Sequence, residues 1–175
     1  MAVSENYFRM IIKQRIAPFE SALADQVREL ILSIQNNEFG MGLTLDDQAD
    51  LKDIESYYQR NGGNFWVTLD GNKVVGTIGV FDIRYQQCVI RKMFVQKEYR
   101  GGQRGIGRAL LLEALEWCRA RKMEEVYLGT SDKLKRAIEF YRRNGFLEIQ
   151  KADLPAAFPG LKVENRFFCM DIRGQ

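Results

Sequence analysis

Residues 91–112 read RKMFVQKEYRGGQRGIGRALLL, and this stretch decides the fold of the chain. An apolar, β-prone run leads into a loop that contains Gly101, Gly102, Gly105 and Gly107, and a leucine-rich helix follows at once. Glycines let the backbone adopt positive φ and approach a ligand closely, while the first N–H groups of a helix have no partner within the helix. These free donors lie at the positive end of the helix dipole. The stretch therefore predicts a strand, a glycine loop and a helix start that together bind an anion.

Three arginines, Arg100, Arg104 and Arg108, flank this loop and indicate an anion with several charges, such as a pyrophosphate. A P-loop would require a lysine followed by Ser or Thr, but residues 102–109 read GQRGIGRA. A dinucleotide fingerprint would require a third glycine where the chain has Leu110. Two interpretations are left: a pyrophosphate held by backbone amides and arginines without a metal ion, or a loop that only turns the chain.

The composition is typical of one ordinary domain, which we place at residues 1–175. The chain has 175 residues, of which 46% are hydrophobic, enough for a real core. No run approaches the ~18 apolar residues of a membrane span, and MAVSENYFRM lacks the features of a signal peptide. The net charge of +3 is too small to indicate a nucleic-acid binder by itself. We therefore expect a cytoplasmic protein that binds neither membrane nor nucleic acid.

Two residue types limit the chemistry. Histidine is absent, which excludes a histidine-activated nucleophile, a histidine metal ligand and a histidine base. Cys88, Cys118 and Cys169 are odd in number and form no CxxC pair, so we expect neither a disulfide framework nor a metal site. All three are expected in core elements, where free cysteine is usually found.

Hydrophobic periodicity and turn residues predict an α/β (α+β) fold with a mixed, largely antiparallel sheet of about seven strands and helices on both faces. The hairpin signal Asp70-Gly71 is the strongest short turn signal. The expected strands are residues 7–16, 64–69, 73–83, 88–96, 124–129, 146–150 and 163–172. The expected helices are residues 20–37, 46 or 47 to about 60, about 105 to 122, and 132–143.

Two segments carry a family resemblance. The run VQKEYRGGQRGIGRALL at residues 95–111, together with RAIEFYRRNGFLEI at residues 136–149, resembles the GNAT superfamily of acetyl-CoA-dependent N-acetyltransferases. The resemblance implies a single acyl-CoA N-acyltransferase domain that transfers an acetyl group from acetyl-CoA, without a metal, to a primary amine by direct attack in a ternary complex.

The resemblance also implies a cofactor site at the glycine loop. The loop is two residues longer than the family pattern, so Arg100, Gln103 and Arg104 are alternative phosphate ligands. The residues expected at acetyl-CoA are Met93, Phe94, Val95, Arg100, Gly101, Gly102, Gln103, Arg104, Gly105, Ile106, Gly107, Arg108, Ala137 and Tyr141.

The same resemblance assigns catalysis to Tyr141, which would stabilise the departing thiolate, while a backbone N–H near residues 93–95 would stabilise the oxyanion. Without histidine, the expected base is a carboxylate that acts through water. Asp82 is the candidate, and Asp132 and Glu98 are alternatives.

The acceptor is expected to be a small molecule or peptide amine, and a second copy of the chain is a further expected partner. In the family the acceptor site involves segments that correspond here to residues 39–45 and 152–163. They hold few charges, which favours an acceptor with an apolar portion; their apolar residues are Phe39, Met41, Leu45, Phe158 and Leu161. The alternative function is a non-catalytic acyl-CoA sensor or interaction module on the same fold.

Overall fold

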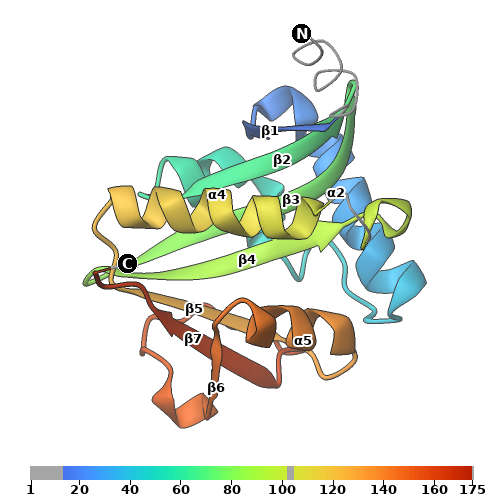
Figure 1. Cartoon of the computed structure of the whole chain (residues 1–175). Coiled ribbons are helices and arrows are strands. Elements are labelled where there is room, and N and C mark those ends of the chain that lie inside the picture. Colours follow the sequence, from blue (N-terminus) through green and yellow to red (C-terminus); the bar gives the residue numbers. More distant parts are fainter. Residues whose placement is uncertain (1–13, 102–104, 175) are drawn as a thin grey trace, which may run out of the picture.

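One seven-stranded sheet organises the molecule. The structure is a computed structural model that describes residues 14–101 and 105–174. The strands follow the order β1-β2-β3-β4-β5-β7-β6 across the sheet (Figure 1). They are β1 (Gln14–Pro18), β2 (Asn64–Asp70), β3 (Lys73–Arg84), β4 (Gln87–Val95), β5 (Glu125–Thr130), β6 (Leu147–Ile149) and β7 (Arg166–Asp171). β4 and β5 run parallel, and all other neighbouring pairs are antiparallel. This confirms the predicted mixed sheet.

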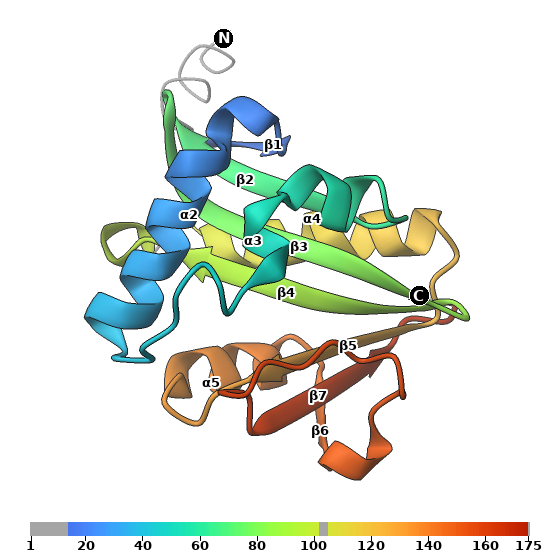
Figure 2. The ribbon, with the colours of Figure 1, turned by 180° about the vertical axis from the view of Figure 1, so that it is seen from behind.

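Helices cover both faces of the sheet, as predicted. α4 and α5 lie on one face, and α2 and α3 lie on the other (Figures 1 and 2). The α-helices in the described part of the chain are α2 (Ala24–Ser33), α3 (Ala49–Lys52), α4 (Ile106–Ala120) and α5 (Lys135–Arg143). Shorter segments are the π-helical turns Ile34–Glu38 and Glu55–Gln59 and the 3₁₀ turns Ser21–Leu23, Lys97–Tyr99 and Lys151–Asp153. None of the helices among these residues has the length and apolar character needed to cross a membrane.

The sheet opens between β4 and β5. Residues Gln87 to Ile90 pair with residues Glu125 to Leu128, and the two strands diverge beyond this short ladder (Figure 2). The edge of β4 that faces β5 therefore has no strand partner after Ile90 within the described residues. This divergence positions the candidate site.

The prediction of a single helix over residues 46–60 is wrong. The chain instead forms α3, continues through Asp53 with an extended φ of −142°, and then makes the turn Glu55–Gln59. The break brings Asp50 and Tyr58 together, and the Tyr58 hydroxyl donates a 2.6 Å hydrogen bond to the carboxylate of Asp50. A continuous helix would separate two residues at this spacing by ~12 Å along its axis.

Several predicted boundaries also shift. β1 continues to Pro18, whereas residues 7–13 of the predicted first strand lie outside the described residues. The last strand begins at Arg166, and residues 163–165 belong to the preceding loop. α5 begins at Lys135, after a turn.

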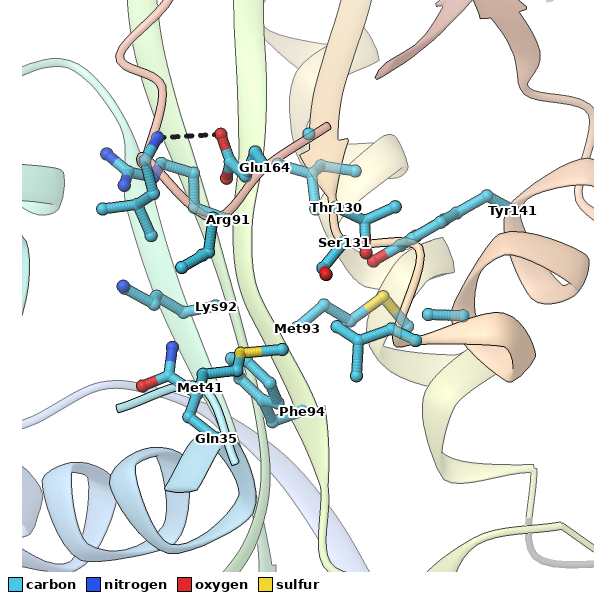
Figure 3. A pocket seen from close by; sticks show the side chains of 16 residues that line it. Gln35, Met41, Arg91, Lys92, Met93, Phe94, Thr130, Ser131, Tyr141 and Glu164 are labelled. Atoms are coloured by element: carbon cyan, nitrogen blue, oxygen red, sulfur yellow. Dashed lines mark hydrogen bonds between the residues drawn. The ribbon is translucent and has the colours of Figure 1, made fainter. Parts of the chain in front are cut away.

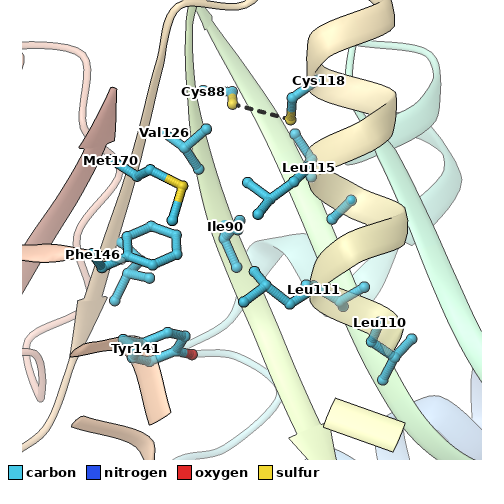
Figure 4. Close-up of a cluster of buried hydrophobic side chains, with 14 of the residues drawn as sticks. Cys88, Ile90, Leu110, Leu111, Leu115, Cys118, Val126, Tyr141, Phe146 and Met170 are labelled. Atoms are coloured by element: carbon cyan, nitrogen blue, oxygen red, sulfur yellow. Dashed lines mark hydrogen bonds between the residues drawn. The ribbon is translucent and has the colours of Figure 1, made fainter. Parts of the chain in front are cut away.

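The core on the α4 face contains two of the three cysteines (Figure 4). Cys88 and Cys118 are fully buried with their Sγ atoms 3.5 Å apart, whereas Cys169 is partly exposed. Tyr141 joins this core through its ring, which contacts Phe146 at a centroid distance of 5.7 Å. The core therefore holds α5 against the sheet next to α4.

Candidate active site

β4 contains a β-bulge next to the point where it leaves β5. The register between β3 and β4 shifts there, so that Lys92 and Met93 together lie opposite Ile78, and Lys92 has a φ of +52°. In a regular strand, consecutive side chains point to opposite faces. At the bulge, Arg91 and Lys92 both reach Asp50 on the same face.

A pocket of about 70 Å³ lies at the divergence of β4 and β5. Met93 and Tyr141 line one half of it, and Arg91, Lys92 and Glu164 line the other half (Figure 3). The two halves face each other across β4. The pocket thus joins a thioether and a phenol on one side to a charged group of side chains on the other.

The charged half is organised around Asp50, which is 2% exposed. Its carboxylate lies 3.4 Å from Lys92 Nζ and 3.9 Å from Arg91 Nη2. Burial lowers the pKa of Lys92 from 10.5 to about 8, although the charge of Asp50 opposes this shift. Lys92 also donates to Gln48 Oε1, and the amides of Gln48 and Gln35 exchange two hydrogen bonds of 2.9 and 3.0 Å.

Glu164 faces this charged half from the loop before β7. One carboxylate oxygen accepts a 2.9 Å hydrogen bond from the backbone N–H of Leu161. Burial raises the pKa of Glu164, and the Leu161 N–H bond together with the charges of Arg91 and Lys92 opposes the rise. A Cβ at Gly129 would lie 2.7 Å from this carboxylate, so a glycine is needed there to admit Glu164.

Tyr141 lies where the sequence predicted it. Its ring packs against Phe140, Phe146 and Phe168, and its hydroxyl points into the pocket beside Ser131 (Figure 3). Burial raises the pKa of Tyr141, and the charge of Glu164 raises it further. The phenol therefore keeps its proton at neutral pH and acts as a hydrogen-bond donor.

Three further predicted cofactor residues, Met93, Phe94 and Ala137, line the same pocket. Val95 does not line it; its side chain packs on the α4 core, and its carbonyl accepts a 2.6 Å hydrogen bond from Arg100 Nε. Arg100 also forms a two-pronged ion pair with Glu38, with Nη2 2.8 Å from Oε2. Its guanidinium is therefore committed to the chain itself rather than open to a phosphate.

The glycine loop leads into α4 as predicted. Gly101 has a φ of +70°, and Gly105, which precedes the helix, has a φ of +58°. No described side chain caps α4, and no described atom lies within 4 Å of a Cβ built at either glycine. Ile106 is buried, and Arg108 is exposed in the first turn. The helix start is therefore open, and a Cβ built at Gly107 would lie 3.7 Å from the methyl carbon of Met93.

Gly102, Gln103 and Arg104 lie outside the described residues, so their predicted contacts with phosphate stay predictions.

Asp82 is not part of this pocket. It pairs with Cys88 near the closed end of the β3–β4 hairpin, and its carboxylate accepts a 2.7 Å hydrogen bond from the backbone of Arg84. The pocket lies at the opposite end of β4, after Ile90. The prediction of Asp82 as the base is corrected because the hairpin register carries it away from the opening.

The predicted acceptor segments contribute in part. Met41 and Leu161 line the pocket, while Phe39 and Leu45 pack on the core beneath α2. Phe158 lines a separate cleft of about 410 Å³ behind Leu161. The charged residues that complete the pocket come from other segments.

Comparisons with known proteins agree with this geometry. A family model described as "Acetyltransferase (GNAT) family" matches residues 28–146, which is more than half of the chain. The chain belongs to the acetyltransferase (GNAT) family. This confirms the resemblance and, with it, the acyltransferase class of enzyme.

Individual GNAT relatives differ in how much they share with the chain. The structure of a GNAT acetyltransferase from Staphylococcus aureus Mu50 is 39% identical, with a TM-score of 0.89 over 91% of this chain and 99% of that one. PaiA N-acetyltransferase from Thermoplasma acidophilum, solved in complex with coenzyme A, is 15% identical with a TM-score of 0.67 over 90% and 98% of the two chains, and it shows a shared fold. N-acetyltransferase family 8 member 2 of Rattus norvegicus is 32% identical over 104 residues, 57% of this chain and 45% of the relative. The match thus spans less than half of that curated relative.

Sequence reasoning missed the charged half of this GNAT site. The sequence patterns assign no role in the site to Arg91 or Lys92, and they place Glu164 in the strand predicted at residues 163–172. One signal was present: Glu164 follows the apolar segment that had been linked to the acceptor. In the described residues, no group of Cys, Asp and Glu side chains is arranged to hold a metal ion.

Proposed function

We propose that this GNAT protein is an N-acetyltransferase that moves an acetyl group from acetyl-CoA to the primary amine of a small molecule or peptide within a ternary complex. The observation that carries the proposal is the pocket at the divergence of β4 and β5. It places a buried phenol, the unpaired edge of a strand and a partly buried carboxylate around one space. Family membership supports the same activity.

The residues present fit acetyl-CoA. The uncapped start of α4, the open space at Gly101 and Gly105 and the exposed Arg108 suit a pyrophosphate. Ala137, Met93 and Tyr141 line the same pocket, which suits the thioester end of the cofactor. The coenzyme A complex of the PaiA neighbour supports this assignment. When bound, acetyl-CoA supplies an acetyl thioester that is activated for attack by an amine.

Three groups of the chain then act on the reaction. An N–H of β4 near Met93 donates to the thioester oxygen as negative charge develops there. Tyr141 donates a hydrogen bond to the departing sulfur; because its pKa is raised, a hydrogen bond rather than complete proton transfer is its role. Holding the amine and the thioester together supplies a proximity advantage of up to ~7–11 kcal/mol.

Glu164 is the base in this proposal. It lines the pocket, lies close enough to influence Tyr141 and has a pKa raised by burial. A raised pKa brings the carboxylate closer to an α-amino group, whose pKa is about 8, and each unit of remaining difference costs ~1.4 kcal/mol. Glu164 therefore takes the proton from the bound ammonium, directly or through water.

The test is a panel of amines incubated with acetyl-CoA, with free thiol measured over time. Turnover of at least one primary amine is expected, with a rate that does not depend on added magnesium. A rise of Tm with coenzyme A but no turnover of any amine would contradict the transferase and favour the acyl-CoA sensor. A cytoplasmic location and a homodimer stay predictions from the sequence.

A further inference from the structure

The guanidinium of Arg91 is buried and uses few of its donors. Its side chain is 7% exposed. Within the described residues it makes one hydrogen bond, from Nη1 to the hydroxyl of Tyr57 at 3.1 Å, while Asp50 lies 3.9 Å from Nη2, beyond hydrogen-bonding distance. A guanidinium has five N–H groups, and buried polar groups are normally hydrogen-bonded. The unused donors of Arg91 line the pocket and suit an anion from outside the chain.

The charges around the pocket are also separated in space. Arg91 and Lys92 share the single carboxylate of Asp50. Glu164, in the same half of the pocket, makes no ion pair within 4.0 Å with either cation in the described structure, and its carboxylate instead accepts a hydrogen bond from the backbone N–H of Leu161. The pocket therefore holds an incompletely paired cation and a carboxylate that forms no ion pair with it.

We propose that the acceptor is a free α-amino acid, whose carboxylate binds Arg91 and whose amine faces Glu164. This deepens the proposed function and rests on it. Arginine and a carboxylate form two parallel hydrogen bonds, a geometry that suits the free donors of Arg91. The amine then lies on the side of Glu164 that faces Tyr141, where the thioester is expected.

Amines without a carboxylate are expected to be poor acceptors. They would leave the remaining donors of the Arg91 guanidinium without a partner, and sites built to hydrogen-bond a substrate group discriminate strongly against analogues that lack it. The N-terminus of a peptide is disfavoured for the same reason, because its α-carboxyl group is an amide. The proposal therefore separates free amino acids from both other classes of amine.

The experiment measures thiol release with acetyl-CoA and each of the twenty amino acids. For every amino acid that reacts, the matching carboxamide and the matching decarboxylated amine are measured as well. The amino acid is expected to have a kcat/KM at least ~100-fold above both analogues. With coenzyme A bound, the same amino acid should raise the Tm, and the decarboxylated amine should not.

Two variants connect this preference to Arg91. Arg91→Gln is expected to raise KM for the amino acid by ~10- to 100-fold, whereas kcat/KM of the decarboxylated amine should not fall, because this amine makes no contact that the guanidinium supplies. Arg91→Lys keeps the positive charge but lacks the two parallel N–H donors of the guanidinium, and it should raise KM for the amino acid by an intermediate factor. Arg60→Gln is the matched control, because Arg60 forms an exposed ion pair with Glu55 at 2.7 Å outside the pocket. Melting curves exclude variants that do not fold.

The outcomes separate this inference from the proposed function. Equal turnover of the amino acid and its decarboxylated amine, or an equal loss of both in Arg91→Gln, would overturn the amino-acid acceptor and leave the transferase intact. Binding of an amino acid to the coenzyme A complex without turnover of any amine would support the zwitterion pocket and contradict the transferase.

Discussion

Asp50 is the carboxylate whose removal tests the charged half of the site most directly. Asp50→Asn keeps the shape of the side chain and removes its charge from a position that is 2% exposed. At an effective dielectric constant of about 20, the distances of 3.4 Å to Lys92 and 3.9 Å to Arg91 correspond to about 5 and about 4 kcal/mol of gross attraction. Desolvation of the carboxylate offsets much of this, so the expected loss of unfolding free energy is ~3–5 kcal/mol at pH 7.

The loss should depend on pH because Lys92 can lose its proton. Its pKa is about 8 in the folded protein, below the ordinary 10.5, so folding disfavours the ammonium and wild-type stability rises between pH 8 and pH 10.5. Without Asp50 the pKa of Lys92 falls further, so the folded variant holds this proton less tightly than the wild type does. At pH 7, the proton that Lys92 retains adds ~1.4 kcal/mol to the free energy of unfolding of the wild type relative to the variant. At pH 9 it adds almost nothing, because Lys92 is then mostly neutral in both proteins. The destabilisation by Asp50→Asn should therefore shrink by ~1.4 kcal/mol over this interval.

Urea unfolding at pH 7 and pH 9 measures the loss of unfolding free energy in Asp50→Asn and its change with pH. Asp46→Asn is the control: it makes the same change at an exposed ion pair with Lys52 of 2.7 Å, and an effect below ~0.5 kcal/mol at both pH values is expected. A loss below ~1 kcal/mol at pH 7, or a loss that grows toward pH 9, would refute the electrostatic account of this cluster.

Three further predictions concern the reaction and the fold. Tyr141→Phe should lower kcat by ~10- to 100-fold with little change in Tm, because the ring keeps its packing and only the donor to the sulfur is lost; an unchanged kcat in steady-state thiol release would remove Tyr141 from the mechanism. Glu164→Gln should lower kcat/KM by ~100-fold or more at pH 7. The decrease should be smaller above the pKa of the acceptor amine, where a base is no longer needed. If the pH–rate profile shows the same decrease in kcat/KM at every pH, Glu164 acts in binding alone. Gly79→Ala should lower the free energy of unfolding by ~1–3 kcal/mol, because the new Cβ would lie 2.8 Å from two aromatic side chains. Gly107→Ala is the control and should be neutral or slightly stabilising, because the nearest atom to its Cβ would lie at 3.7 Å. Equal melting temperatures for the two variants would contradict the packing argument.

Local sequence patterns were sufficient for the features that depend on neighbouring residues. The strand, glycine loop and helix of residues 91–112 follow from an apolar run, glycine and a leucine-rich repeat, and Gly71 adopts the positive φ of 60° that the Asp70-Gly71 hairpin signal predicts. Tyr141 was placed correctly because it lies on a helix with a clear end at Gly145.

The position of Asp82 required information that these patterns lack. Its place at the end of a predicted strand was nearly right, but the register of β3 against β4 decides which end of the hairpin meets the pocket. A strand pattern repeats every two residues and does not specify its partner or its register. The broken helix between Asp50 and Tyr58 has a similar cause, since a buried hydrogen bond outweighs local helix preference.

By itself, the sequence therefore determined the class of fold, the glycine loop that leads into α4 and the position of Tyr141 on α5, because each arises from residues close together in the chain. Only the tertiary structure decided the charged half. A one-residue bulge turns Arg91 and Lys92 toward Asp50, and the loop before β7 brings Glu164 to face them. These groups come from distant segments, and their meeting depends on strand register and loop packing, which no local periodicity records.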